Sequence, residues 1–279
     1  MELRPFGPAR VPVPRYGQGT WQMEADDRAG AVAALRAGLE LGMTHIDTAE
    51  LYGSGEVETI VAEAIAGWRD RIFLVSKVMP TNATKKGTLR ACEATLKRLG
   101  TDHLDCYLLH WPGSHPLEGT IDAFEALQKD GKIRSYGVSN FDEDELEEAF
   151  ALAGPGKIAC NQVLYHLGER GIEHAVVPWC EAHEVSVVGY TPFGRSTFPP
   201  APGRAVLEDI AERRGATARQ VALAFLTRKP SLFAIPKASG LAHVLDNAGA
   251  AALELSAAEL QAIDAAFPVG QRRRGVATL

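Results

Sequence analysis

Short apolar segments alternate with longer helix-patterned segments along the whole chain, and this alternation constrains the fold most strongly. The apolar segments are flanked by turn residues, and at least ten residues with a helical pattern separate one from the next. Repeated β-α units of this kind build a parallel sheet. The predicted strands cover Tyr16–Gly19, His45–Asp47, Ile72–Lys77, His103–His110, Ile133–Ser139, Cys160–Val163, Val185–Tyr190 and Leu232–Ile235.

Eight such strands predict a (β/α)8 barrel, the TIM-barrel form of the α/β class. Barrels of about 250 residues form one domain, and no linker or change in composition divides this chain, so we expect residues 1–279 to be a single domain. A doubly wound open sheet is the alternative. Before the first strand, Glu2–Phe6 and Arg10–Val13 alternate in polarity around Gly7, which predicts a β-hairpin that plugs the bottom of the barrel.

Helix-start signals support the alternation. Thr217 with Gln220 and Ser256 with Glu259 have the spacing of capping boxes, in which side chains satisfy the first free backbone N–H groups. Asp142 precedes a run of acidic residues, which favours the start of a helix because negative charge stabilises its N-terminal end.

Composition gives little indication of a macromolecular partner. The net charge is −6, which indicates neither nucleic acid nor an anionic membrane as a partner. No apolar run approaches the roughly 18 residues of a membrane helix, and the first ten residues lack the apolar core of a signal peptide. Four widely spaced cysteines suggest no disulfide framework. We therefore expect a cytoplasmic protein, with the basic cluster Arg272–Arg274 in a solvated tail.

Polar residues stand at the ends of three predicted strands that are consecutive in the chain. Asp47 ends the second strand, Lys77 the third and His110 the fourth, while Tyr52 follows Asp47 by five residues. Loops at the carboxyl ends of parallel barrel strands share one mouth, where active sites lie. We therefore expect these four side chains to lie close together.

Each of these residues alone could have a structural role, but together they suggest acid catalysis. Lys77 lies within the apolar segment Phe73–Val78, and a buried lysine needs a partner, for which Asp47 is the natural choice. A neighbouring ammonium stabilises the phenolate of Tyr52 and so favours a lower pKa, which suits proton donation. His110 can donate a hydrogen bond to a carbonyl oxygen on which negative charge develops.

Five segments resemble signature motifs of the aldo-keto reductases, in the order in which that family has them. They are Gly42–Gly53, Leu108–Pro112, Gly137–Phe141, the pair Asn161-Gln162, and Ile235–Ser239. The resemblance implies that Tyr52 is the general acid, that Asp47 and Lys77 tune it, and that His110 orients the substrate carbonyl. A histidine at this fourth-strand position, rather than a glutamate, implies reduction of a carbonyl rather than of a carbon–carbon double bond.

The same resemblance implies an extended nicotinamide cofactor, NADP(H) in preference to NAD(H). It assigns cofactor binding to Gly19, Thr20, Ser139, Asn140, Gln162, Tyr190, Thr191, Pro192, Phe193, Lys237, Ser239, His243 and Asn247. Lys237 and Ser239 would hold the adenosine 2′-phosphate where a helix begins, a usual place for anions in barrels. His243 stands where arginine is frequent, so we expect a less absolute preference, with NAD(H) as an alternative, and NADPH affinity that rises as the imidazole is protonated.

Trp21 and Trp111 match aromatic substrate-pocket positions of the family, with Leu51 and Phe193 as further candidates. Substrate choice in the family depends on long loops. Only twelve residues follow Phe267, which implies an open site for small aldehydes, ketones or dicarbonyls.

The sequence is compatible with three other functions. His45 and Asp47, with His110 and His166, have a spacing that some metal sites use, but the family places His45 inside the barrel one layer below Asp47, and we expect no metal. A barrel aldolase with Lys77 as Schiff base, or alternatively Lys237, is a second class. A non-enzymatic, cofactor-binding relative of the family is a third.

Overall fold

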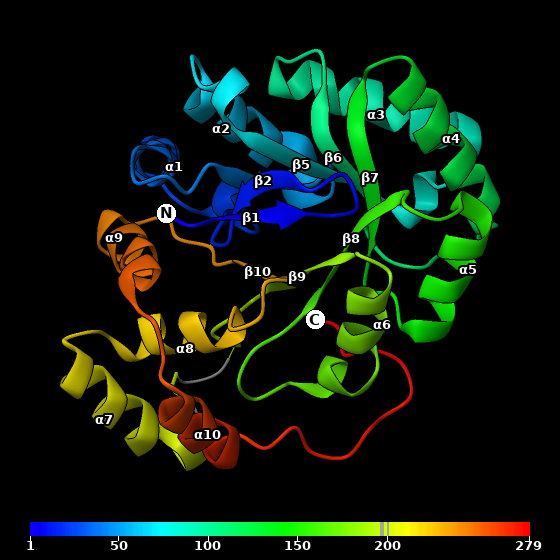
Figure 1. Cartoon of the computed structure of the whole chain (residues 1–279). Helices are drawn as coiled ribbons and strands as arrows, with labels where there is room; N and C mark the ends of the chain where they lie inside the picture. The colour runs from blue at the N-terminus through cyan, green and yellow to red at the C-terminus, as the bar shows by residue number, and fades with distance from the viewer. Residues whose placement is uncertain (196–197, 200) are drawn as a thin grey trace.

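A sheet of eight parallel strands forms the centre of the molecule, in a computed structural model that describes residues 1–195, 198–199 and 201–279 (Figure 1). Each strand pairs with its neighbours in chain order, as the sequence predicts. The strands are β3 (Gln18–Gly19), β4 (His45–Asp47), β5 (Phe73–Val78), β6 (Leu104–Leu109), β7 (Ile133–Ser139), β8 (Ile158–Leu164), β9 (Ser186–Tyr190) and β10 (Leu232–Ile235).

The sheet closes on itself between its first and last strands. Parallel bridges join Tyr16 to Ala234 and Gly19 to Lys237, and the Gly17 N–H donates to the Ala234 carbonyl at 2.8 Å. The strands approach so closely that a Cβ on Gly19 would lie 2.6 Å from the carbonyl oxygen of Ile235. The predicted barrel is confirmed, and the alternative of an open sheet is wrong.

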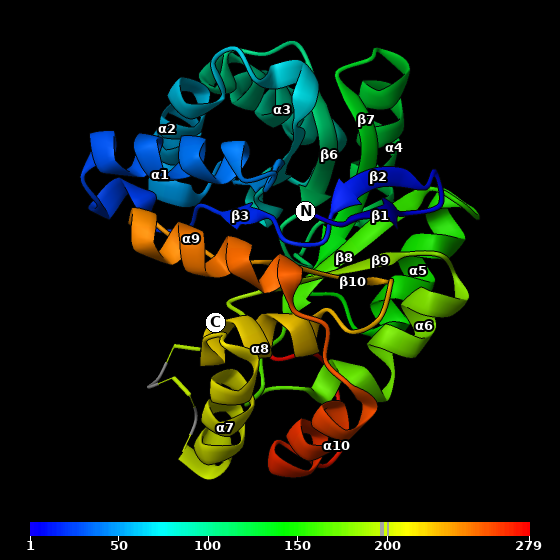
Figure 2. The ribbon, with the colours of Figure 1, turned by 60° about the vertical axis from the view of Figure 1, so that its left-hand side comes forward.

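Helices surround the barrel, and α9 packs between α1 and α8 (Figure 2). Their bounds are α1 (Arg28–Glu40), α2 (Glu56–Ile65), α3 (Lys85–Leu99), α4 (Leu117–Lys129), α5 (Glu143–Ala153), α6 (Val176–Ala182), α7 (Arg204–Arg214), α8 (Ala218–Leu226), α9 (Leu241–Gly249) and α10 (Ala257–Ala266). The capping boxes predicted at Thr217 and Ser256 both form, and Asp142 forms a third at the start of α5.

The predicted N-terminal hairpin consists of β1 (Leu3–Phe6) and β2 (Val11–Pro14), and it lies across one end of the barrel (Figure 1). The Phe6 ring centroid lies 4.9 Å from that of Phe73 and 5.1 Å from that of Phe233, and it also contacts the His45 ring at 6.1 Å. His45 is buried among these rings, and burial lowers its pKa to about 3. The imidazole is therefore neutral and forms part of the core.

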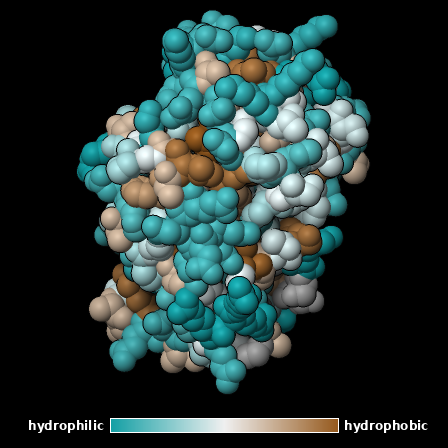
Figure 3. Space-filling view, turned by 90° about the vertical axis from the view of Figure 1, so that its right-hand side faces the viewer, coloured by the Kyte–Doolittle hydropathy of each residue, from teal (hydrophilic) through white to brown (hydrophobic). Residues whose placement is uncertain are grey.

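The surface of the molecule is mostly polar on the face that Figure 3 shows, and the C-terminal tail carries exposed arginines. On the face drawn in Figure 3, hydrophobic residues occur in small groups among hydrophilic ones. Among the described residues, no helix is both long and apolar enough to cross a membrane. Arg272, Arg273 and Arg274 are all exposed, as expected for a solvated tail, and two of them also lie beside surface carboxylates. Arg272 pairs with Glu143, and Arg273 lies 3.6 Å from a carboxylate oxygen of Glu169.

Replacing Phe6 by alanine tests the role of the hairpin as a structural plug. We expect Phe6→Ala to lower the free energy of unfolding by about 3–5 kcal/mol, because it empties a site enclosed by three rings. Urea denaturation measures the change. Val11→Ala, at a hairpin position that is 39% exposed, should change stability by less than about 0.5 kcal/mol. Equal, small losses in the two variants would show that the hairpin is not part of the core.

Candidate active site

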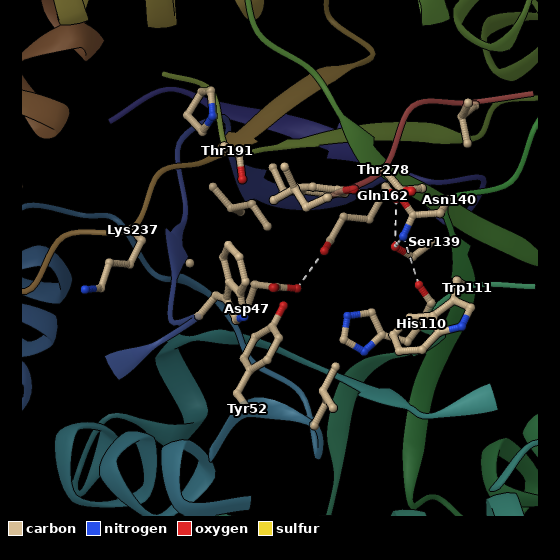
Figure 4. A pocket seen from close by; sticks show the side chains of 18 of the residues that line it. Asp47, Tyr52, His110, Trp111, Ser139, Asn140, Gln162, Thr191, Lys237 and Thr278 are labelled. Atoms are coloured by element: carbon tan, nitrogen blue, oxygen red, sulfur yellow. Dashed lines mark hydrogen bonds between the residues drawn. The ribbon is translucent and has the colours of Figure 1, made fainter. Parts of the chain in front are cut away.

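A pocket of about 890 Å³ opens at the carboxyl ends of the barrel strands, and Figure 4 shows its interior. Its wall includes Asp47 from the end of β4, Ser139 from β7, Gln162 from β8 and Tyr190 from β9, together with residues of the loops that follow. The closed barrel therefore brings together side chains from strands that are far apart in the sequence.

Lys77 is the centre of the hydrogen-bond network beneath this pocket. Its side chain is fully buried, and its Nζ donates to Asp47 Oδ1 at 2.5 Å, to the Thr48 carbonyl at 3.0 Å and to the Tyr52 hydroxyl at 3.1 Å. An ammonium has three protons to donate, so each one has an acceptor. The predicted grouping of Asp47, Tyr52 and Lys77 is thus present in the structure.

Burial and charge act in opposite directions on the Lys77–Asp47 pair. Burial disfavours the Lys77 ammonium, but the neighbouring Asp47 and Tyr52 outweigh burial and raise the pKa of Lys77. Burial likewise raises the pKa of Asp47, and the Lys77 charge and a hydrogen bond from Gln162 Nε2, at 2.7 Å, offset that rise in part. Lys77 is consequently held as a cation.

Tyr52 begins the short kinked segment η2 (Tyr52–Gly55), and its ring centroid lies 4.9 Å from Lys77 Nζ. Ser54 is left-handed, with φ of 53°, and a side chain at Gly55 would clash with Arg98. Arg98 is itself held at 2.5 Å by the fully buried carboxylate of Glu58, on α2. The Arg98–Glu58 pair therefore packs against the loop that carries Tyr52.

The pKa of Tyr52 is raised, not lowered as the sequence suggested. Burial of the phenol is the largest cause, and the Lys77 charge acts in the predicted direction without overcoming it. The sequence could not show this balance, because it depends on how tightly the phenol is enclosed. At neutral pH Tyr52 is therefore a protonated phenol with a proton available to donate.

His110 also contacts the phenol of Tyr52. Its ring centroid is 5.7 Å from that of Tyr52, in an edge-on arrangement, and 4.8 Å from that of Trp111. Burial, with the Lys77 charge, lowers the pKa of His110 to about 2, so the imidazole is neutral. Its Nδ1 is buried and has no hydrogen-bond partner among the described residues. A neutral imidazole can present an N–H to a substrate oxygen.

The predicted cofactor residues occupy opposite sides of the pocket (Figure 4). On one side the Asn140 amide donates to the His110 carbonyl at 3.0 Å and accepts from the Tyr190 hydroxyl at 2.9 Å. On the other side is Lys237, just after β10. Those that line the wall are Gly19, Thr20, Ser139, Asn140, Gln162, Tyr190, Thr191, Pro192, Phe193 and Lys237.

Three predicted cofactor residues lie outside the pocket wall. The Ser239 hydroxyl accepts a hydrogen bond from Lys237 Nζ at 3.2 Å. His243 is exposed on the first turn of α9, and Asn247 is buried on the same helix. Their cofactor contacts stay predictions.

The substrate-pocket candidates Trp21, Trp111, Leu51 and Phe193 all line the pocket. Sequence reasoning missed several other residues of this wall, among them Gln22, Arg195 and the tail residues Gly275, Val276, Thr278 and Leu279. Gln22 could have been predicted, because it follows the pocket candidate Trp21 in the sequence. Nothing in the composition of the tail indicated that its residues line the pocket. The tail thus forms part of the pocket wall, and the open site expected from its length stays a prediction.

No group of three or more potential metal ligands occurs within the part of the chain that the structure describes. His45 packs against aromatic rings, and the Asp47 carboxylate is bonded to Lys77 and Gln162. Both residues of the suggested metal pair thus have other roles.

Removing the Lys77 charge should destabilise the fold in a pH-dependent way. We expect Lys77→Met to cost about 3–5 kcal/mol, because it leaves a buried carboxylate unpaired. Without Lys77, burial raises the pKa of Asp47 further above its unfolded value, so the loss should grow as the pH rises from 5 to 8. Urea denaturation at both pH values measures the difference from the unsubstituted chain.

The double variant Asp47→Asn/Lys77→Met is the control for this prediction. It removes both charges, so it should recover part of the lost stability and lose the added pH dependence. If the single and double variants were equally stable at both pH values, Asp47 and Lys77 would not be coupled.

Comparison with known proteins places the chain in a family. The Aldo/keto reductase family model matches residues 15–267. Methylglyoxal reductase YeaE of Escherichia coli is 47% identical over 92% of this chain and 92% of its own length. Glyoxal reductase of Bacillus subtilis is 32% identical over 91% of this chain and 89% of its own.

A solved structure supports the same conclusion. An aldo/keto reductase from Klebsiella pneumoniae, crystallised with NADP and acetate, superposes with a TM-score of 0.93 at 44% identity, over 100% of this chain and 99% of that one. The chain therefore belongs to the aldo/keto reductase family and is an oxidoreductase.

Proposed function

We propose that the protein reduces a small aldehyde, ketone or dicarbonyl to the alcohol with NADPH, and that Tyr52 donates the proton. The observation that carries this proposal is the Tyr52 hydroxyl, which sits 3.1 Å from a buried ammonium and lines the same pocket as His110.

The residues of this chain perform the acid half of the reaction. A bound nicotinamide cofactor supplies the hydride. His110, as a neutral imidazole, orients the carbonyl oxygen by donating a hydrogen bond, and Tyr52 transfers its proton to that oxygen as negative charge develops. The adjacent Lys77 ammonium stabilises the phenolate that remains, and Asp47 keeps the ammonium charged without exposing it to solvent.

The pocket residues fit a dinucleotide cofactor. Hydrogen-bonding groups of Ser139, Asn140 and Gln162 occupy one side, in reach of a carboxamide, and the Lys237 cation occupies the other, in reach of a phosphate. Relatives from Klebsiella pneumoniae were crystallised with NADP and with NADPH, which supports NADP(H) here. NAD(H) is the weaker alternative.

The substrate end of the pocket favours small carbonyl compounds. Trp21, Trp111, Leu51 and Phe193 give it an apolar wall, to which the tail residues Val276 and Leu279 also contribute. Similar proteins named methylglyoxal reductase and glyoxal reductase support a small dicarbonyl as substrate.

The Schiff-base alternative has little support in this geometry. A lysine nucleophile must be neutral, whereas Lys77 donates three hydrogen bonds and has a raised pKa. Lys237 is paired with Asp26. The complete group of Asp47, Tyr52, Lys77 and His110 likewise disfavours a relative without catalysis.

Removing the Tyr52 hydroxyl should abolish most of the reductase activity. We expect Tyr52→Phe to lower kcat by about 10²–10⁴-fold, because the proton donor is gone, while the dissociation constant for NADP+ stays close to that of the unsubstituted chain. Loss of NADPH absorbance with methylglyoxal and other small aldehydes measures the rate.

Tyr136→Phe is the matched control. Tyr136 lies on β7 with a buried hydroxyl that has no partner among the described residues, so losing that hydroxyl should leave the activity close to normal. A Tyr52→Phe enzyme as active as the control would remove Tyr52 from the mechanism.

Removing the Lys237 charge should weaken the preference for NADPH. We expect Lys237→Met to lower kcat/KM for NADPH about 10- to 100-fold, since a charge-assisted contact to the 2′-phosphate is lost, with little change for NADH. Steady-state kinetics with both cofactors at fixed aldehyde concentration test this. Equal kcat/KM values for NADPH and NADH in the unsubstituted enzyme would contradict the preference itself.

A further inference from the structure

Lys237 already has an anionic partner, and that partner comes from the opposite end of the sequence. Asp26 follows the 3-10 helix η1 (Met23–Ala25), and its Oδ2 lies 2.5 Å from Lys237 Nζ. The Asp26 N–H donates to the Met23 carbonyl at 3.1 Å, which fixes the backbone that presents the carboxylate. The parallel bridge between Gly19 and Lys237 fixes the backbone that presents the lysine.

This ion pair is accessible to a ligand. The Lys237 and Asp26 side chains are 33% and 29% exposed, so solvent and solutes reach both. Figure 4 shows the Lys237 side chain on the side of the pocket away from Ser139 and Asn140. A nucleotide that spans the pocket would therefore bring its far end to the Asp26–Lys237 pair.

The Asp26 carboxylate should weaken the binding of NADP(H), which has a 2′-phosphate, and should not weaken the binding of NAD(H), which has a 2′-hydroxyl. A phosphate monoester carries a charge of roughly −1.5 to −2 near neutral pH, so a 2′-phosphate beside Lys237 is repelled by the Asp26 carboxylate and competes with it for the ammonium. A ribose 2′-hydroxyl carries no charge and can donate a hydrogen bond to a carboxylate, as it does to acidic residues in other dinucleotide sites.

We propose that Asp26 is a specificity-determining residue, which competes with the 2′-phosphate for Lys237 and thereby narrows the preference for NADP(H) over NAD(H). This inference rests on the proposed function, because it takes Lys237 as the phosphate-binding residue. It assigns to the loop after β3 a role in cofactor choice, in addition to its part in the substrate wall through Trp21.

Asp26→Asn is the test variant, and Asp27→Asn is its matched control. Both substitutions remove one negative charge from adjacent positions. Asp27 caps α1, with its Oδ2 accepting from the Gly30 N–H at 2.7 Å, and asparagine caps a helix about equally well. Of these two aspartates, Asp26 is the one that is bonded to Lys237, so a difference between the variants isolates the ion pair from a general change in charge.

Isothermal titration calorimetry with NADP+, NAD+, adenosine 2′,5′-bisphosphate and AMP gives the affinities without relying on turnover. We expect Asp26→Asn to bind NADP+ and the bisphosphate about 3- to 30-fold more tightly, and NAD+ and AMP no more tightly than before. Asp27→Asn should change each affinity by less than about twofold, since its charge is not paired with Lys237. Asp26→Ser, which also lacks the charge, should behave like Asp26→Asn.

The outcomes separate this inference from the proposed function. If Lys237→Met weakens NADP+ binding but Asp26→Asn leaves the ratio of NADP+ to NAD+ affinity unchanged, the role of Asp26 is refuted and the cofactor proposal stands. An Asp27→Asn variant that matches Asp26→Asn would likewise refute a direct role. If the unsubstituted chain binds neither NADP+ nor the bisphosphate, both proposals fail.

Discussion

The buried ammonium of Lys77 is the interaction on which the rest of the site depends. A lysine inside a barrel strand is tolerated only with acceptors for all of its protons, and here Asp47, Thr48 and Tyr52 provide them. Those acceptors come from β4 and the loop after it, so the requirement to satisfy one charge also fixes the phenol at the mouth of the barrel. Stability and chemistry therefore share the same contacts.

Burial, rather than charge alone, sets the protonation of this site. It raises the pKa of Tyr52 despite the adjacent cation and lowers that of His110 to about 2, so the phenol keeps its proton and the imidazole stays neutral. Both groups can then donate hydrogen bonds to one oxygen. At the far side of the pocket the Asp26–Lys237 pair is partly exposed, and there a charged ligand can compete directly with a protein carboxylate.

The barrel and the catalytic group could be predicted from sequence because both follow from local patterns. Asp47, Lys77 and His110 stand at, or within one residue of, the ends of apolar strands, which places them at one edge of a parallel sheet whatever the packing details. The pairing of Asp26 with Lys237 joins positions 211 apart, and Thr278 lines the pocket although it follows the last helix by more than ten residues, so no periodic signal could reveal either contact. The sequence predicts the wrong direction for the pKa shift of Tyr52, because that direction depends on how far the folded protein buries the phenol.

A crystal structure of the protein with NADP+ and an unreactive carbonyl compound would show whether Tyr52 and His110 hold the reacting oxygen. We expect the carbonyl oxygen within about 3.2 Å of both the Tyr52 hydroxyl and a ring nitrogen of His110, with Lys77 still bonded to Tyr52 and Asp47. A carbonyl oxygen held by other groups, or a Tyr52 hydroxyl turned away from Lys77 toward solvent, would contradict this expectation.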